Sequence, residues 1–151
     1  DAVVLDWLRA QAAGARKVFS VCTGALLLGA AGLLRGRHAT THWNSLHLLP
    51  LFGATPVDER VVVDGDWIFA AGVTSGIDGA LRLAAEMFGD AVAQRIQLNM
   101  AYAPEPPFNS GTPETAPADV LAAARAAFAD LTAQREFTAR EIAMQLGIAV
   151  R

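Results

Sequence analysis

The sequence predicts an α/β fold: a three-layer sandwich with a mainly parallel, flavodoxin-like sheet. Short apolar segments rich in β-formers, such as 18–21, alternate with longer segments of helical period, such as 77–88. This alternation is typical of a sheet that has helices on both faces. The chain has 151 residues, of which 53% are hydrophobic and 18% are charged. That size and composition allow one compact domain with a substantial core.

The elements follow from local patterns along the chain. Apolar residues at helical spacing predict a helix over 2–12, and Val18-Phe19-Ser20-Val21 predicts a buried strand. Asp64-Gly65 is a favoured two-residue turn and predicts a hairpin around it. The segment 103–117 contains five prolines and no helical period, which indicates a long loop. The other expected elements are helices over 25–34, 44–52, 77–88, 90–102, 118–133 and 138–146, and strands over 37–42, 60–63 and 67–70.

Composition excludes several classes of function. The net charge is −3 and the isoelectric point is about 5.5, which disfavours a nucleic-acid surface. A single cysteine cannot form an internal disulfide. No apolar run is long enough to span a membrane, and no targeting segment is visible, so we expect a cytoplasmic protein. No metal-ligand spacing and no glycine-rich phosphate loop occurs, so we expect no metal and no cofactor.

Cys22 stands where the strand predicted over 18–21 runs into the helix predicted over 25–34. A nucleophile on such a tight turn is exposed at the carboxyl edge of the sheet, and Gly24 would let the helix approach closely. Backbone N–H groups at the start of a helix favour an anion, which suits a thiolate. Cys22 is therefore the candidate nucleophile. The alternative is a buried cysteine that packs as a small apolar residue.

Three further residues are candidates for the same site, each with a structural alternative. His42, at the end of the second predicted strand, would act as base or orienter for the thiolate, or would only cap a helix. Asp78 is a site carboxylate or only a favourable charge in the first turn of a helix. Thr23 would donate a hydrogen bond to an intermediate, or would serve as an N-cap. For His42 and Asp78 the structural role is favoured.

Three segments carry a resemblance to the ThiJ/PfpI superfamily, also called class I glutamine amidotransferase-like. They are VCTGALLLGAAGLLRGRHATTHW over 21–43, AAGVTSGIDGALRLAAEMFGDAVAQ over 70–94 and QLNMAYAPEPPFNSGTPETAP over 97–117. Two subgroups share this pattern, the isonitrile hydratases and the amidotransferase-like domains of AraC-type regulators. An aromatic residue followed by Pro-x-Pro-Pro-Phe and Gly-x-Pro is typical of the hydratases. The resemblance covers roughly residues 1–125.

The resemblance implies a hydro-lyase that needs no cofactor. Cys22, as thiolate, would attack the terminal carbon of an isonitrile, a carboxylic acid would protonate the thioimidate, and water would release an N-substituted formamide. Thr23 matches the residue after the family's cysteine, and its N–H would help to hold the intermediate. The resemblance also implies a homodimer, with contacts from the Pro-rich loop and the terminal helices.

The sequence departs from the family pattern in two places. The family's domain begins further upstream, with strands and the acidic residue that supplies the proton, and neither has a counterpart here. We therefore expect residues 1–151 to form a single domain that lacks its N-terminal part. The family's Pro-Pro-Phe is commonly followed by Asp, whereas this sequence has Asn109, which would keep hydrogen bonding but not charge.

Two other functions stay open at this point. The chain is alternatively the ligand-sensing domain of an AraC-type transcriptional regulator. Residues 137–148 resemble the first helix and turn of a helix-turn-helix, but an ordinary amphipathic helix is the preferred interpretation. The other possibility is a stress-type protein in which Cys22 is oxidised, or which handles reactive carbonyl compounds.

Overall fold

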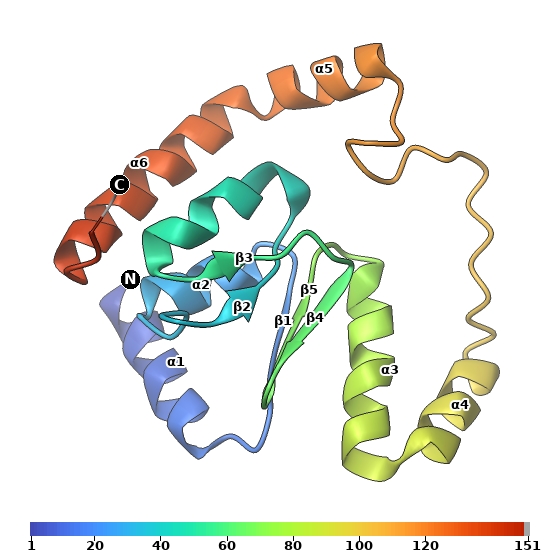
Figure 1. The fold of residues 1–151 in the computed structure, drawn as a ribbon. Coiled ribbons are helices and arrows are strands. Elements are labelled where there is room, and N and C mark those ends of the chain that lie inside the picture. Colours follow the sequence, from blue (N-terminus) through green and yellow to red (C-terminus); the bar gives the residue numbers. More distant parts are fainter. Residues whose placement is uncertain (150–151) are drawn as a thin grey trace.

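The computed structural model describes residues 1–149 and has a three-stranded sheet at its centre (Figure 1). β1 (Val18–Val21) pairs in parallel with β5 (Trp67–Ala70), and β5 pairs antiparallel with β4 (Val61–Asp64). β5 lies between the other two strands and is buried along its whole length. A small parallel sheet joins β2 (His38–Ala39) to β3 (Thr55–Pro56).

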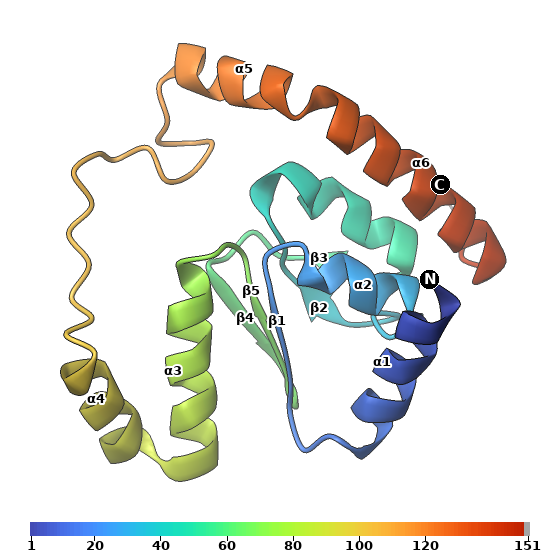
Figure 2. The same cartoon turned by 180° about the vertical axis from the view of Figure 1, so that it is seen from behind.

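Helices cover both faces of the central sheet, which confirms the α/β class and the layered arrangement (Figures 1 and 2). On one face α3 packs against β1 and β5, and α4 packs against α3. On the other face α2 packs against β1, with the 3-10 helix η1 beside it and α1 and α6 outside. The helices are α1 (Ala2–Gly14), α2 (Gly24–Ala30), η1 (Trp43–Phe52), α3 (Ser75–Phe88), α4 (Asp90–Asn99), α5 (Ala118–Ala127) and α6 (Ala129–Gln145).

Two glycines let α3 lie directly on the sheet. A Cβ added to Gly79 would stand 2.7 Å from Cε2 of Phe19, and one added to Gly76 would stand 2.9 Å from Cγ1 of Val21. Such distances are shorter than van der Waals contact, so larger residues would push the helix away. The first half of α3 therefore lies close to the carboxyl end of β1.

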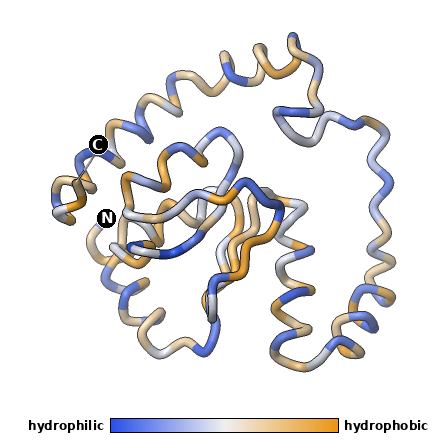
Figure 3. Tube along the Cα trace, viewed as in Figure 1, coloured by the Kyte–Doolittle hydropathy of each residue, from blue (hydrophilic) through white to orange (hydrophobic). Residues whose placement is uncertain are grey.

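The core lies between the sheet and the layer formed by α2 and η1. The tube coloured by hydropathy shows the apolar residues concentrated along the central strands and the neighbouring helices (Figure 3). Within the described residues no helix combines the length and the apolar character needed to cross a membrane. The large side chains with less than 2% exposure include Leu34, Leu48, Leu49, Ile68 and Phe69.

Most predicted elements are present, and the differences have local causes. The strand over 18–21 and the hairpin are confirmed. The strand predicted over 37–42 is only two residues long, since Thr40 and Thr41 leave it as buried loop. The helix predicted over 25–34 ends at Ala30, because Gly32 turns the chain with a φ of 77°.

The last two predicted helices are divided differently in the structure. The break falls at Phe128, which has a φ of −103° and a ψ of 4°, and not over residues 134–137. Residues 134–137 are Gln-Arg-Glu-Phe, and the first three favour a helix.

The central sheet is mixed. β1 and β5 are parallel, whereas β4 and β5 form the predicted antiparallel hairpin.

Candidate functional site

Cys22 occupies a left-handed conformation at the junction of β1 and α2. Its φ is 56°, and among residues 1–149 only one other residue apart from glycine, Ala101, has a positive φ. A left-handed conformation costs an ordinary residue about 1–2 kcal/mol. The surrounding structure holds it: the N–H of Cys22 donates to the Ala70 carbonyl at 2.8 Å, and its carbonyl accepts from Oγ1 of Thr41 at 2.8 Å.

The next two residues begin α2. Thr23 stands at the N-cap position, but its side chain makes no capping hydrogen bond. Within the described part of the chain its N–H has no hydrogen-bond partner either, so it is available to a ligand. The structure gives Gly24 no close-packing role, because a Cβ there would lie 3.8 Å from Cβ of Ser20, an ordinary contact. The close approach of α2 is instead at Gly29, which packs on Phe52 of η1.

A cavity of about 530 Å³ opens beside the cysteine. Its walls are residues 41–43 after β2, residues 58–60 before β4, residues 71–75 between β5 and α3, and residues 111–114 of the Pro-rich loop. Cys22 does not line the cavity itself, but its backbone bonds to Thr41 in one wall and to Ala70, which precedes another wall. Parallel β1 and β5 end at the same edge of the sheet, and this brings the walls together.

His42 lines the cavity and caps η1. Its Nδ1 accepts a hydrogen bond from the N–H of Asn44 at 3.4 Å, and its ring centroid lies 5.3 Å from that of Trp43. Burial, and to a lesser extent the positive charge of Arg135, holds the pKa of His42 below 6.5. The ring is therefore neutral at pH 7. No hydrogen bond joins His42 to Cys22 among the described residues, so a role as its base stays a prediction.

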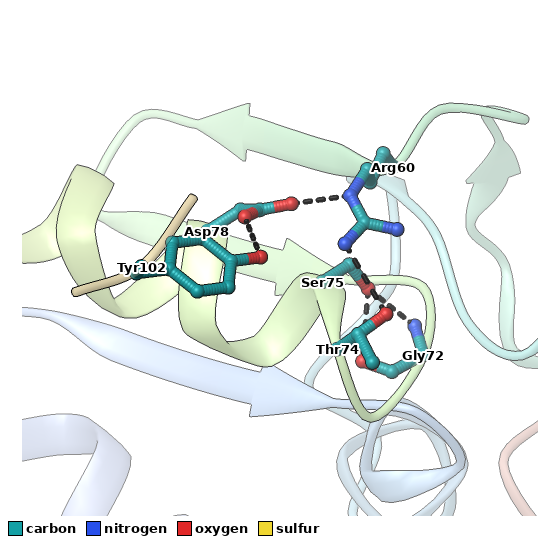
Figure 4. A network of polar contacts seen from close by, with 6 residues as sticks. All are labelled: Arg60, Gly72, Thr74, Ser75, Asp78 and Tyr102. Carbon is teal, nitrogen blue, oxygen red and sulfur yellow. Dashed lines mark hydrogen bonds and ion pairs between the residues drawn. The ribbon is translucent and has the colours of Figure 1, made fainter. Parts of the chain in front are cut away.

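Asp78 does more than supply charge to the first turn of α3 (Figure 4). One carboxylate oxygen forms an ion pair with Nε of Arg60, and the other accepts from the Tyr102 hydroxyl at 2.6 Å. Nη2 of Arg60 also donates to Oγ1 of Thr74, at 3.2 Å, in the turn that lines the cavity. Asp78 contacts the walls of the site and not the cysteine.

Asn109 lies exposed in the Pro-rich loop and is not part of the cavity wall. Its role stays a prediction. Sequence reasoning missed Thr41, Arg60 and Tyr102. Tyr102 is the single tyrosine of the chain and the aromatic residue of a family-like segment, so it was available as a candidate. Thr41 lies in the family-like segment 21–43 and Arg60 lies in none, and the importance of both comes from contacts between segments distant in sequence.

The charge around the cavity is negative. Asp58, Glu59 and Glu114 line it, and none of them takes part in an ion pair within residues 1–149. The positive charge of Arg60 is balanced by Asp78. No group of three or more His, Cys, Asp or Glu residues in the described chain is arranged to hold a metal ion.

Known proteins are similar to this chain in sequence and fold. The sequence profile of the DJ-1/PfpI family matches residues 1–86. Isonitrile hydratase of Pseudomonas putida is 57% identical over 125 residues, which is 83% of this chain and 55% of that protein. The crystal structure of a ThiJ/PfpI family protein from Pseudomonas syringae superposes with a TM-score of 0.89 at 43% identity, over 92% of this chain and 57% of that one.

A regulator also matches, more weakly. The HTH-type transcriptional regulator CdhR of Pseudomonas aeruginosa is 33% identical over 97 residues, which is 62% of this chain and 28% of that protein. The chain thus spans little more than half the length of the Pseudomonas putida isonitrile hydratase and of the Pseudomonas syringae protein.

Proposed function

The chain belongs to the DJ-1/PfpI family, and from this premise we propose that it carries the nucleophile of an enzyme that hydrates isonitriles to N-substituted formamides. The observation that carries the proposal is Cys22, held left-handed at a strand-to-helix junction beside a cavity. A relative with 57% identity over most of the chain is named isonitrile hydratase, which supports the choice of substrate class.

The proposed reaction adds one water molecule without oxidation or reduction. The Cys22 sulfur bonds to the terminal carbon of R–N≡C, and that carbon takes up a proton, which gives the thioimidate R–N=CH–S–Cys22. Water then adds to this carbon while the nitrogen takes up a proton. The C–S bond breaks, the hydroxyl proton returns to the sulfur, and R–NH–CHO leaves. In this proposal the N–H of Thr23, which has no partner within the described residues, donates a hydrogen bond to the intermediate.

The other site residues have supporting roles in this proposal. His42 is neutral and forms part of the cavity wall, so it shapes the site instead of carrying charge. The family resemblance assigns the proton donor to a carboxylic acid ahead of residue 1. Gly24 and Asn109 lie outside the cavity wall, and in this proposal they are supporting residues.

The test follows formation of N-cyclohexylformamide from cyclohexyl isocyanide. Because the chain spans about half of its relatives, both residues 1–151 and the full-length protein that its gene encodes are assayed. We expect turnover in the full-length protein and a loss of about 10³-fold or more in Cys22→Ala and Cys22→Ser. Turnover that survives both substitutions would remove Cys22 as nucleophile. No turnover, with Cys22 still readily alkylated at pH 7, would redirect the site towards carbonyl chemistry or sensing.

A ligand-sensing domain of a transcriptional regulator is the second candidate. It is supported by the 33% identity to an HTH-type regulator over 97 residues. Against it, the regulator matches 62% of this chain at 33% identity, whereas isonitrile hydratase matches 83% at 57% identity. Binding of the full-length protein to a defined promoter fragment in a salt-resistant, sequence-specific manner would favour this candidate over the enzyme.

We also propose a homodimer in the cytoplasm. The large apolar side chains of Leu98 and Phe108, at the end of α4 and in the Pro-rich loop, are 79% and 78% exposed. Exposed apolar groups of this size often mark an interface. Light scattering coupled to gel filtration, and fractionation of cells, test the two statements. A monomer at tens of micromolar would contradict the first.

A further inference from the structure

Four side chains connect three segments of the chain around Asp78 (Figure 4). Arg60, Thr74, Asp78 and Tyr102 make up this Asp78 network. Asp78 is its centre, because each carboxylate oxygen binds a different partner: Oδ2 binds Arg60, and Oδ1 accepts from Tyr102 at 2.6 Å. A carboxylate bonded on both oxygens has little freedom to rotate.

Through Arg60 the network holds the first wall of the cavity. The Arg60 carbonyl accepts from the N–H of Ala71 at 3.0 Å, and its guanidinium donates to Thr74 at 3.2 Å. The same turn is closed internally by Ser75, which is 1% exposed, accepts from the Gly72 N–H at 2.6 Å and donates to the Gly72 carbonyl at 2.8 Å. The turn is thus fixed both from within and by Arg60, the residue before β4.

Through Tyr102 the network holds the start of the Pro-rich loop, whose residues 111–114 line the cavity further along the chain. Tyr102 follows Ala101, which has a φ of 50°, and begins the Pro-rich loop. Its backbone bonds twice to Gln97 of α4, through N–H to carbonyl and through carbonyl to Nε2, each at 3.1 Å. The loop then runs outside the body of the molecule to residues 111–114, which line the cavity (Figure 1).

The far end of the loop is held separately. α5 and α6 follow the loop, and Nδ2 of Asn44 in η1 donates to Oγ1 of Thr132 in α6 at 2.8 Å. Between these two attachments the loop has only local hydrogen bonds, such as those between Thr112 and Thr115. The Tyr102 hydroxyl therefore ties the start of the loop to α3 directly, in addition to the two bonds from Gln97 of α4, a helix that packs on α3.

We propose that Asp78 is a positioning residue, which sets the width of the cavity beside Cys22 by holding at once Arg60, in one wall, and Tyr102, at the start of the loop whose residues 111–114 form another wall. The consequence for substrate binding rests on the proposed function, whereas the coupling between the walls does not. A carboxylate with an equally full set of partners, Glu86 at the other end of α3, contacts no cavity residue and is the natural control.

The experiment compares Asp78→Asn and Tyr102→Phe with Glu86→Gln. Tyr102 is the single tyrosine of residues 1–151, so its ionisation is measured directly by absorbance of the tyrosinate. The hydrogen bond to Asp78, with burial, holds the pKa of Tyr102 above 10.0. We expect Asp78→Asn to lower that pKa towards its ordinary value and Glu86→Gln to leave it unchanged.

Two further measurements report how mobile the loop and the turn are in each variant. NMR order parameters for residues 103–110, and amide exchange in the turn 72–76, report their mobility. We expect Tyr102→Phe to loosen the loop alone, Asp78→Asn to loosen both walls, and Glu86→Gln to loosen neither. In the full-length enzyme we expect Tyr102→Phe and Asp78→Asn to raise KM about three- to tenfold, with kcat within about twofold.

The outcomes separate this proposal from the proposed function. Unchanged order parameters and exchange in Asp78→Asn and Tyr102→Phe would overturn the coupling of the walls, whether or not isonitriles are hydrated. A fall in kcat without a rise in KM would overturn the claim that Asp78 sets the width of the cavity for the substrate. Looser walls in a protein that hydrates no isonitrile would uphold the coupling and remove the proposed substrate. If Asp78→Asn does not fold, Tyr102→Phe, which removes one hydroxyl, decides the result.

Discussion

The two ends of α3 use similar carboxylates for different purposes. Asp78 in its first turn faces the carboxyl edge of the sheet, with Cys22, the cavity and the Pro-rich loop nearby. Glu86 in its last turn faces the amino edge, where it binds Lys17 at 3.0 Å and Arg82 at 3.0 Å. Asp78, at the site end of α3, thus connects segments that are distant in the sequence. Glu86, at the far end, connects α3 to Lys17, the residue before β1.

The same two ends also differ in backbone strain and in charge. The positive φ angles at the site end belong to Cys22 and Ala101, which bear side chains, whereas those near the far end belong to Gly65 and Gly89. Carboxylates around the cavity have no ion-pair partner in the described chain, whereas Lys17 is bound by both Asp66 and Glu86. Strain and unbalanced charge gathered at one edge are typical of a functional site.

The largest expected effect tests how closely α3 must lie on the sheet near the site. Gly79→Ala places a methyl group 2.7 Å from the Phe19 ring, and we expect a loss of about 2 kcal/mol in the free energy of unfolding. Gly14→Ala in α1, where a Cβ has no neighbour within 4 Å, is the matched control and should change stability by less than about 0.5 kcal/mol. Equal effects in urea denaturation would contradict the close approach.

The second effect tests the unbalanced charge of the site end. If the cavity takes isonitriles, its carboxylates Asp58, Glu59 and Glu114 should disfavour an anionic substrate. We expect isocyanoacetate to have a kcat/KM about tenfold below that of its neutral methyl ester at low salt, with the gap narrowing as ionic strength rises. Glu59→Gln should raise the value for the anion and leave the ester unchanged, and Glu86→Gln should affect neither.

Local chemistry made most of the fold predictable. The strand over 18–21, the Asp64-Gly65 hairpin and the loop over 103–117 each follow from a few adjacent residues, and the structure has all three. The break between α5 and α6 was predicted at the wrong place, because a sequence of good helix formers does not reveal where packing against η1 begins.

The site was predictable only in part, for a different reason. The position of Cys22 between a strand and a helix was predictable and the structure has that junction, with a φ of 56° at Cys22, whereas its role as nucleophile stays a prediction. Thr41 and Arg60 could not be found, because each acts through a partner 18 or 19 positions away in the chain. For His42 the geometry shows the capping role, and for Asp78 it shows a network of contacts that neither interpretation had included.

The third effect compares the backbone strain at Cys22 with that at the far end, where glycines adopt the positive φ angles without strain. Cys22→Ala and Cys22→Gly both remove the thiol, but only glycine accepts a φ of 56° without a steric cost. We expect the glycine variant to be more stable than the alanine variant by about 1 kcal/mol. Gly65→Ala, at a φ of 62° in open space, should be destabilising by a similar amount. An alanine variant as stable as the glycine variant would show that Cys22 is unstrained.

The smallest expected effect is a difference between the two ends in how their contribution to stability depends on pH. Burial lowers the pKa of His42 below 6.5, and Lys17 with Arg82 lowers that of Glu86 below 4.5. In both cases the unfolded chain binds the proton first as pH falls, so stability is lost on acidification, below 6.5 for His42 and below 4.5 for Glu86.

His42→Asn keeps an acceptor at the N-cap and has no group that titrates in this range, so it should flatten the loss of stability that begins as the pH falls below about 6.5. Glu86→Gln should flatten it only below about pH 4.5. The measurement is the free energy of unfolding in urea at half-unit steps from pH 8 to pH 3. If both variants changed the free energy of unfolding over the same pH range, the site end and the far end would not be the electrostatically separate regions that their contacts indicate.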